Sequence, residues 1–139
     1  MDHIAYIKNS CELEDLLQGK KSVIVRGARG RQLPYDGAHP GDNVYFVKDS
    51  SNEVVAKGII KDAVNSAPLG KKDPARLISE NIEKLGLGDK ELLGWAKRKH
   101  ILLIEFGTIN RVMPFSIDFL KTPQRDWHPV GYINKIRKA

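Results

Sequence analysis

Cysteine is almost absent from the sequence: Cys11 is the only one among 139 residues. An internal disulfide is therefore impossible, and a zinc site built on several cysteines is excluded. The sequence also has no apolar run of about 18 to 20 residues, the length that crosses a bilayer, and it begins without the basic and then apolar pattern of a secretion signal. These absences predict a reduced, cytoplasmic protein with no membrane segment. We expect Cys11 to be a partly buried helix residue.

Metal-like spacing is also missing. The four histidines, at positions 3, 39, 100 and 128, do not fall into pairs or triplets of the kind that bind metal ions. We therefore expect each histidine to be a surface or loop residue, and we predict neither a metal site nor a cofactor. The length and ordinary apolar content predict one globular domain over residues 1–139.

Acidic side chains are absent from residues 19–31, and this gap belongs to an uneven charge distribution. Residues 1–18 carry a net charge of −3, residues 19–48 carry +4, residues 49–96 carry −1 and residues 97–139 carry +6. The overall charge of +6 is thus concentrated in two blocks. Clustered basic charge favours polyanions because contacts to phosphates release counterions. Charge alone also fits a merely soluble basic surface.

Apolar spacing divides the chain into short elements. Strands are expected at 3–8, 22–27, 42–49, 53–64, 100–109 and 112–119, with a short strand or turn at 131–136. Helices are expected at 11–18, 74–85 and 90–98, and Gly19 and Gly86 are placed to end the first two. Gly58, inside the strand 53–64, suggests a bulge or sharp bend.

The segment 27–42 holds four glycines and two prolines, which indicates a long loop. The strands 42–49 and 53–64 are separated by a short turn and are expected to form a hairpin. Hairpins with few helices between strands predict an α+β fold built on a mostly antiparallel sheet. Short strands with a bend-forming glycine would close into a small β-barrel with flanking helices.

The segment Gly19-Lys20-Lys21-Ser22-Val23-Ile24-Val25-Arg26 resembles the G-x-K-x-x-E-x-R signature of ASCH domains, a branch of the PUA-like β-barrel superfamily. Its surroundings are similar as well: Pro40-Gly41-Asp42 leads into a strand, as the family's Gly-Asp step does, and the E-V-V-A-x-G-x-I pattern at 53–60 and the strand around Glu105 follow in the same order. The resemblance extends over about residues 3–109. It implies a PUA-like barrel and an RNA or nucleotide ligand.

One position of the signature departs from the family. Ile24 stands where ASCH domains usually have glutamate, and where the acetylcytidine amidohydrolases that look like ASCH domains have a threonine thought to act as nucleophile. Isoleucine has no hydroxyl, so it can neither attack a carbonyl nor donate a hydrogen bond. Lys21 and Arg26 carry over from the signature. Ser22 shares the face of Ile24 on the strand and remains, with Lys21, a candidate for catalysis.

The predicted ligand-binding residues are mainly cations. Five of them lie within twelve residues that contain no acid: Lys20, Lys21, Arg26, Arg29 and Arg31. Arginine suits phosphates and base edges, and it stacks on bases. The alternative is a solvated basic loop with an arginine held by Asp36 or Asp42. A second block, Lys97-Arg98-Lys99-His100, contributes Lys97 and Arg98, and it equally fits cations at a helix C-terminus.

Two further residues have open interpretations. Trp127 lies between Arg125 and His128 in sequence, next to Asp126, and an aromatic ring among cations can stack on a base. Packing against the barrel is the alternative for this ring. Glu105 lies in an apolar strand, where a carboxylate needs a partner. We expect an ion pair with a basic residue, and a ligand contact is the other possibility.

The sequence therefore favours an RNA- or nucleotide-binding module that uses a basic strand and loop, because Ile24 favours binding over catalysis. One alternative is a small amidohydrolase acting on a modified nucleoside with Lys21 as base. A second alternative is an interaction protein whose basic surface binds an acidic partner. The oligomeric state is left open.

Overall fold

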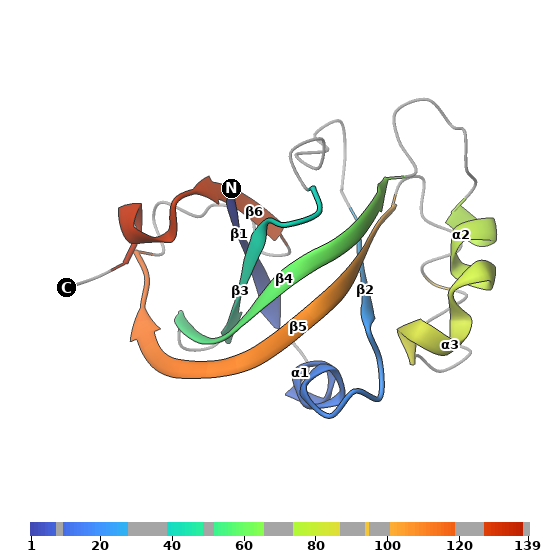
Figure 1. The fold of residues 1–139 in the computed structure, drawn as a ribbon, viewed down its shortest axis with the longest axis horizontal. Helices are drawn as coiled ribbons and strands as arrows, with labels where there is room; N and C mark the ends of the chain where they lie inside the picture. The colour runs from blue at the N-terminus through green and yellow to red at the C-terminus, as the bar shows by residue number, and fades with distance from the viewer. Residues whose placement is uncertain are drawn as a thin grey trace.

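The computed structural model describes residues 1–7, 10–27, 39–48, 52–65, 74–86, 94, 101–118 and 127–137 (Figure 1). The described strands are β1 (Asp2–Ile7), β2 (Val23–Gly27), β3 (Asn43–Lys48), β4 (Glu53–Asn65), β5 (Ile101–Ser116) and β6 (Trp127–Gly131). The described helices are α1 (Ser10–Leu17), α2 (Pro74–Glu80), α3 (Ile82–Leu85) and a 3-10 helix, η3 (Ile133–Lys135). None of the helices within these residues is long and apolar enough to cross a bilayer.

The six strands form a single sheet in the order β2-β5-β4-β3-β1-β6. Every neighbouring pair is antiparallel except β1 and β3, which run parallel. The expected hairpin is present, with Tyr45 opposite Lys57 between β3 and β4. The predicted mostly antiparallel sheet is therefore confirmed, and β2 and β6 are its two edges.

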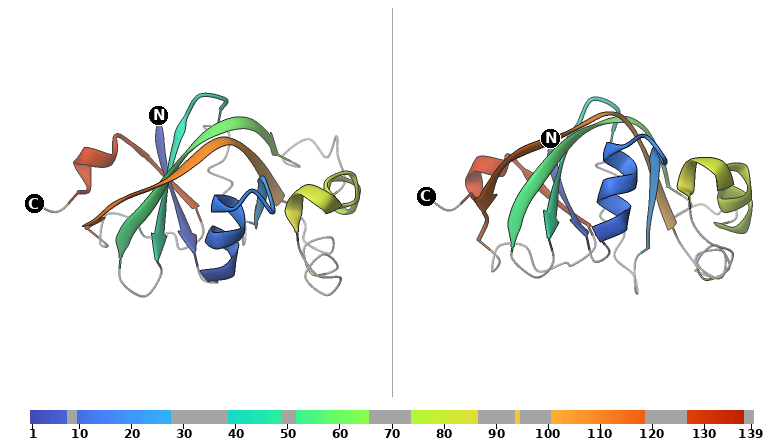
Figure 2. Two further views of the ribbon diagram at one scale, coloured as in Figure 1. Left: turned by 60° about the horizontal axis from the view of Figure 1, so that its bottom comes forward. Right: turned by 90° about the horizontal axis from the view of Figure 1, so that it is seen from below.

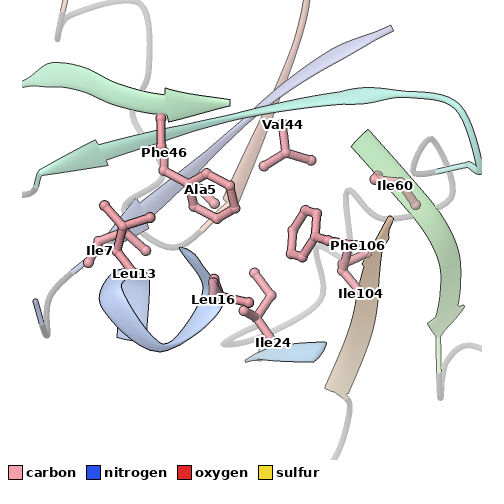
Figure 3. Packing of buried hydrophobic residues seen from close by; sticks show 11 residues of the cluster. Ala5, Ile7, Leu13, Leu16, Ile24, Val44, Phe46, Ile60, Ile104 and Phe106 are labelled. Atoms are coloured by element: carbon pink, nitrogen blue, oxygen red, sulfur yellow. The ribbon is translucent and has the colours of Figure 1, made fainter. Parts of the chain in front are cut away.

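The sheet is strongly curled, and α1 lies within its concave side between β1 and β2 (Figures 1 and 2). The main core fills this concave side (Figure 3). It combines side chains of the helix with side chains of five strands: Leu13 and Leu16 from α1, and Ala5, Ile7, Ile24, Val44, Phe46, Ala56, Ile60, Ile104 and Phe106. The Arg111 guanidinium also pairs with the Glu14 carboxylate, which links α1 to β5. Burial of one apolar stripe thus holds α1 against the sheet.

Two smaller apolar clusters cover the outer face. One joins Val23, Val25 and Leu103 of the β2–β5 edge to Ile78 and Leu85 of α2 and α3. The other packs η3 against β1, β3 and β4 through Ile4, Tyr6, Val47, Val54, Ile117, Ile133 and Ile136. Asp2, a buried carboxylate, ties this second cluster together because it accepts hydrogen bonds from the Ile133 N–H at 2.8 Å and the Asn43 amide at 3.1 Å.

The expectation of two strands at 100–109 and 112–119 is wrong, because β5 continues unbroken from Ile101 to Ser116. The register passes from Phe115 opposite Val54 to Arg111 opposite Ala56, so the intervening residues, Pro114 among them, lie in a bulge. A proline is tolerated there because a bulged residue need not donate to the ladder.

The expected single helix at 74–85 is interrupted at Asn81, which separates α2 from α3. The Asn81 N–H bonds back only three residues, to the Ile78 carbonyl, and this tight turn ends the first helix. The expected helix 90–98 lies outside the described residues apart from Gly94. Cys11 is on a helix as expected, but it is exposed rather than partly buried because the apolar stripe of α1 is formed by Leu13 and Leu16.

Candidate nucleic-acid interface

Residues 19–31, which we call the basic segment, begin where α1 ends. Gly19 has a φ of +76°, and the Lys20 N–H reaches the Asp15 carbonyl at 2.8 Å while the Gly19 N–H reaches the Leu16 carbonyl at 3.3 Å. This pair of bonds is a Schellman motif, so the predicted glycine stop is confirmed. The turn leaves the Lys20 side chain exposed at the start of the segment.

Lys21 faces inward, unlike Lys20. It is only 5% exposed, and its Nζ lies 3.4 Å from Oε2 of Glu12 on α1. A buried ammonium without an opposite charge would be costly, and the Glu12 carboxylate supplies that charge. This pair is not evident from the sequence, because its members are nine positions apart and a helix end lies between them. Lys21 could therefore bind a ligand only while buried and already paired with Glu12.

Ser22 connects the segment to two other elements through its backbone. Its N–H donates to the Lys84 carbonyl at 3.1 Å, and its carbonyl accepts from the Phe106 N–H at 2.9 Å. Lys84 also pairs with Glu105 at 3.1 Å, which confirms the expected ion pair of that carboxylate. The start of β2 is thus fixed by α1, by the end of α3 and by β5.

Ile24 is fully buried in the main core (Figure 3). It lies with Leu16, Ile104 and Phe106, whereas Val23 and Val25 belong to the outer cluster, as the predicted alternation of β2 requires. The position at which related signatures carry an acid or hydroxyl is thus occupied here by packed hydrocarbon.

The other predicted contacts are only partly described. The backbone of Arg26 pairs with Leu102 in the sheet, and that of Trp127 pairs with Ala5, but both side chains lie outside the described part of the structure. Arg29, Arg31, Lys97, Arg98 and Asp36 also fall outside the described residues. The structure therefore brings together Lys20, Lys21 and Ser22 at the start of β2, and positions the backbone of Arg26 at its far end.

His3 is fully buried, so the expectation that it is a surface or loop residue is wrong. It lies on β1, which is flanked by β3 and β6, and its Nε2–H donates to Oδ2 of Asp42 at 2.9 Å. Asp42 also accepts from the His39 N–H at 3.0 Å and from the amino group of Met1 at 3.3 Å. These contacts anchor residues 39–42, from which β3 starts.

We expect this pair to make stability depend on pH. Burial lowers the pKa of His3 below its ordinary value of about 6.5, against the opposing effects of Asp42 and Asp2. The unfolded chain then binds more protons than the folded protein as the pH falls below about 6.5, so the free energy of unfolding decreases until the lowered pKa is passed. Hydrogen bonds from His3, His39 and the amino terminus outweigh the opposing effect of burial and lower the pKa of Asp42, so a second loss follows below about pH 3.9.

Urea unfolding between pH 7.5 and 5 measures this effect. The His3→Gln variant keeps a donor for Asp42 but does not titrate, so its free energy of unfolding should change less across this window. An equal decrease in both proteins would assign the pH dependence to other groups.

Two groups of aromatic rings and cations include residues near the C-terminus, and the sequence does not indicate either of them. The Arg137 guanidinium lies 4.3 Å from the centre of the Phe115 ring, and Phe115 contacts Tyr45 edge to face at 6.3 Å. Lys57 lies 5.7 Å from the Tyr45 ring. Lys135 lies 5.8 Å from the ring of Tyr132. We call these six residues the C-terminal aromatic surface.

Within the ranges that the structure describes, no group of three or more histidine, cysteine, aspartate or glutamate side chains is arranged to hold a metal ion.

Comparison with solved structures finds similar folds at low sequence identity. The crystal structure of the ASCH protein from Zymomonas mobilis matches 96% of this chain and 91% of its own, with a TM-score of 0.68 and 12% identity. Structures of two variants of that protein match equally well, with TM-scores of 0.69 and 0.70 and identities of 11% and 13%. Neither a comparison with protein-family models nor one with curated proteins finds a match.

Proposed function

We propose that this chain, which folds as an ASCH domain of the PUA-like type as its sequence predicts, is an RNA- or nucleotide-binding module. In this proposal Lys20 and the arginines at 26, 29 and 31 contact phosphates. Lys97 and Arg98 extend the positive surface, and Trp127 stacks on a base. Lys21 contributes from its buried pair with Glu12.

The observation that carries the proposal is the way in which the fold presents the first residues of the basic segment, Gly19 to Ser22. The Schellman motif and the backbone bonds of Ser22 fix the residues that lead into β2, and Lys20 is exposed beside them. A cation on a fixed backbone loses less conformational entropy when it binds a phosphate than one on a mobile chain. Three arginines follow along the same acid-free stretch of the sequence, at 26, 29 and 31.

The burial of Ile24 supports binding rather than hydrolysis. Hydrolysis of an amide needs a nucleophile that reaches the substrate, and this position offers only an alkyl group within the core. Hydrolysis by an amidohydrolase and binding of an acidic protein are therefore the alternatives that the experiments distinguish from RNA binding.

Fluorescence anisotropy with a mixed-sequence single-stranded RNA at low salt tests the proposal. We expect saturable binding that weakens as salt is added, because phosphate contacts release counterions. Replacing Arg29 and Arg31 by glutamine should weaken binding and lower the salt slope by about 1.4, or about 0.7 for each phosphate contact with a single strand.

A matched control separates contact from overall charge. The double variant Lys61→Gln/Arg76→Gln removes the same two charges from exposed positions on β4 and α2, and it should bind nearly as well as the parent protein. If both double variants lose the same RNA affinity, the loss reflects net charge and not contacts of Arg29 and Arg31. Absence of saturable RNA binding would overturn the proposal, and salt-sensitive capture of an acidic protein would then favour the protein-binding alternative.

A further inference from the structure

The C-terminal aromatic surface has a ring that contributes little to the core. The Tyr132 side chain is 70% exposed, although it lies between Val130 and Ile133, which pack into the outer cluster. An aromatic ring usually stabilises a fold by being buried, and this ring is mostly exposed, so it adds little to the stability of the fold. The ring, which Lys135 approaches to 5.8 Å, is therefore accessible to a ligand.

The backbone around Tyr132 is well fixed. Its N–H donates to the Val130 carbonyl at 2.9 Å, and its carbonyl accepts from the Lys135 N–H at 3.1 Å. The next residue, Ile133, is buried and its N–H is held by the Asp2 carboxylate. An aromatic ring on such a backbone is preorganised, so binding costs less conformational entropy than it would on a mobile chain.

The charge of this region favours an anionic ligand. Residues 127–139 contain Lys135, Arg137 and Lys138 and no acid. Lys135 and Arg137 are both exposed, and Lys57 on β4 adds a third cation beside the Tyr45 ring. Asp118 lies next to the segment, joined through its N–H to the Ile136 carbonyl, and the cations outnumber it. A polynucleotide complements both parts of this region, because its flat bases suit the exposed ring and its phosphates suit the exposed cations.

We propose that the C-terminal aromatic surface is a second contact site for single-stranded RNA, an inference that rests on the proposed RNA-binding function. A base stacks on the Tyr132 ring, and the Lys135 and Arg137 side chains meet the flanking phosphates. Arg137 is already held over Phe115, so its charge is oriented before the ligand arrives. The combination of an aromatic platform and neighbouring cations is how proteins bind single strands with little sequence preference.

The sheet places this site away from residues 19–27, the described part of the basic segment. β2 and β6 are opposite edges of the six-stranded sheet, Trp127 stands at the start of β6, and η3 follows β6 in the chain. A strand of RNA that reached both sites would therefore lie across the molecule (Figure 1). This arrangement predicts that an oligonucleotide binds more tightly than a mononucleotide, because one molecule occupies two sites.

The test compares Tyr132→Ala with Tyr132→Phe in the full chain, using a labelled single-stranded RNA of about 12 nucleotides. Loss of the ring should weaken binding about tenfold, the effect expected for one stacked base, whereas phenylalanine should preserve it. The parent protein, crosslinked to RNA containing 4-thiouridine, should yield a labelled peptide that includes Tyr132. Both substitutions alter an exposed side chain, and circular dichroism verifies that both variants fold.

The outcomes distinguish the two proposals. If Tyr132→Ala binds RNA as tightly as Tyr132→Phe, while the Arg29/Arg31 variant is weakened, the second site is overturned and the RNA-binding function stands. If the parent protein binds no RNA, both proposals fail. A loss confined to Tyr132→Ala, with crosslinks to its peptide, establishes the second site.

Discussion

Replacing Ile24 with threonine is expected to lower the free energy of unfolding by about 2 to 4 kcal/mol and to create no hydrolytic activity. The side chain is fully buried among Leu16, Ile104 and Phe106. Threonine removes apolar volume from this packing and introduces a hydroxyl among hydrocarbon neighbours. Both changes lower stability, and the hydroxyl would lie in the core, where a substrate cannot reach it.

Ile24→Val is the matched control, since it removes a single methylene and adds no polar atom. It should cost about 0.5 to 1.5 kcal/mol. Urea unfolding of the three proteins gives the differences, and incubation with acetylcytidine measures hydrolysis. A threonine variant as stable as the valine variant, or release of cytidine by that variant, would show that this position opens to a ligand and would favour the amidohydrolase alternative.

The fold could be predicted to a useful extent because its local determinants are strong. The alternation of Val23, Ile24 and Val25 predicts two faces of β2, and the structure assigns them to separate clusters. Gly19 ends α1 with the positive φ that glycine tolerates. The signature around these residues, taken together with the order of the elements, led to the fold that the comparison with solved structures supports.

Contacts between distant segments were not predictable in the same way. In the sequence Lys21 is one of several cations in a basic segment, and only the packing of α1 shows that Glu12 lies beside it. The stacking of Arg137 on Phe115 joins the last described residues to β5, and the composition of neither segment indicates it. His3 is predicted at the surface because a single histidine in a short strand does not reveal that this strand lies between two others and that the side chain is buried. Such features depend on how the sheet curls.

Gly58 is the position where that curl leaves no room for a side chain. A Cβ atom there would lie 3.0 Å from Cδ1 of Phe106, 3.2 Å from Cγ1 of Ile109 and 3.3 Å from Cε2 of Phe46. The sequence predicts a bulge or bend at this glycine, and the register shift lies one residue later, between Ile59 and Ile60. The glycine is required chiefly because two aromatic rings approach the backbone.

Gly58→Ala is therefore expected to lower the free energy of unfolding by about 1 to 3 kcal/mol, as overpacking of a core does. The Phe46 and Phe106 rings pack against each other with their centres 5.3 Å apart, so neither can move away without disturbing the other. Gly107 on the neighbouring strand provides the control, because its Cβ would come no closer than 3.8 Å to Lys61. Gly107→Ala should change stability by no more than about 0.5 kcal/mol. If urea unfolding shows equal effects of the two substitutions, the close contacts at Gly58 add nothing to the general effect of replacing a strand glycine by alanine. The rings would then move aside for a methyl group.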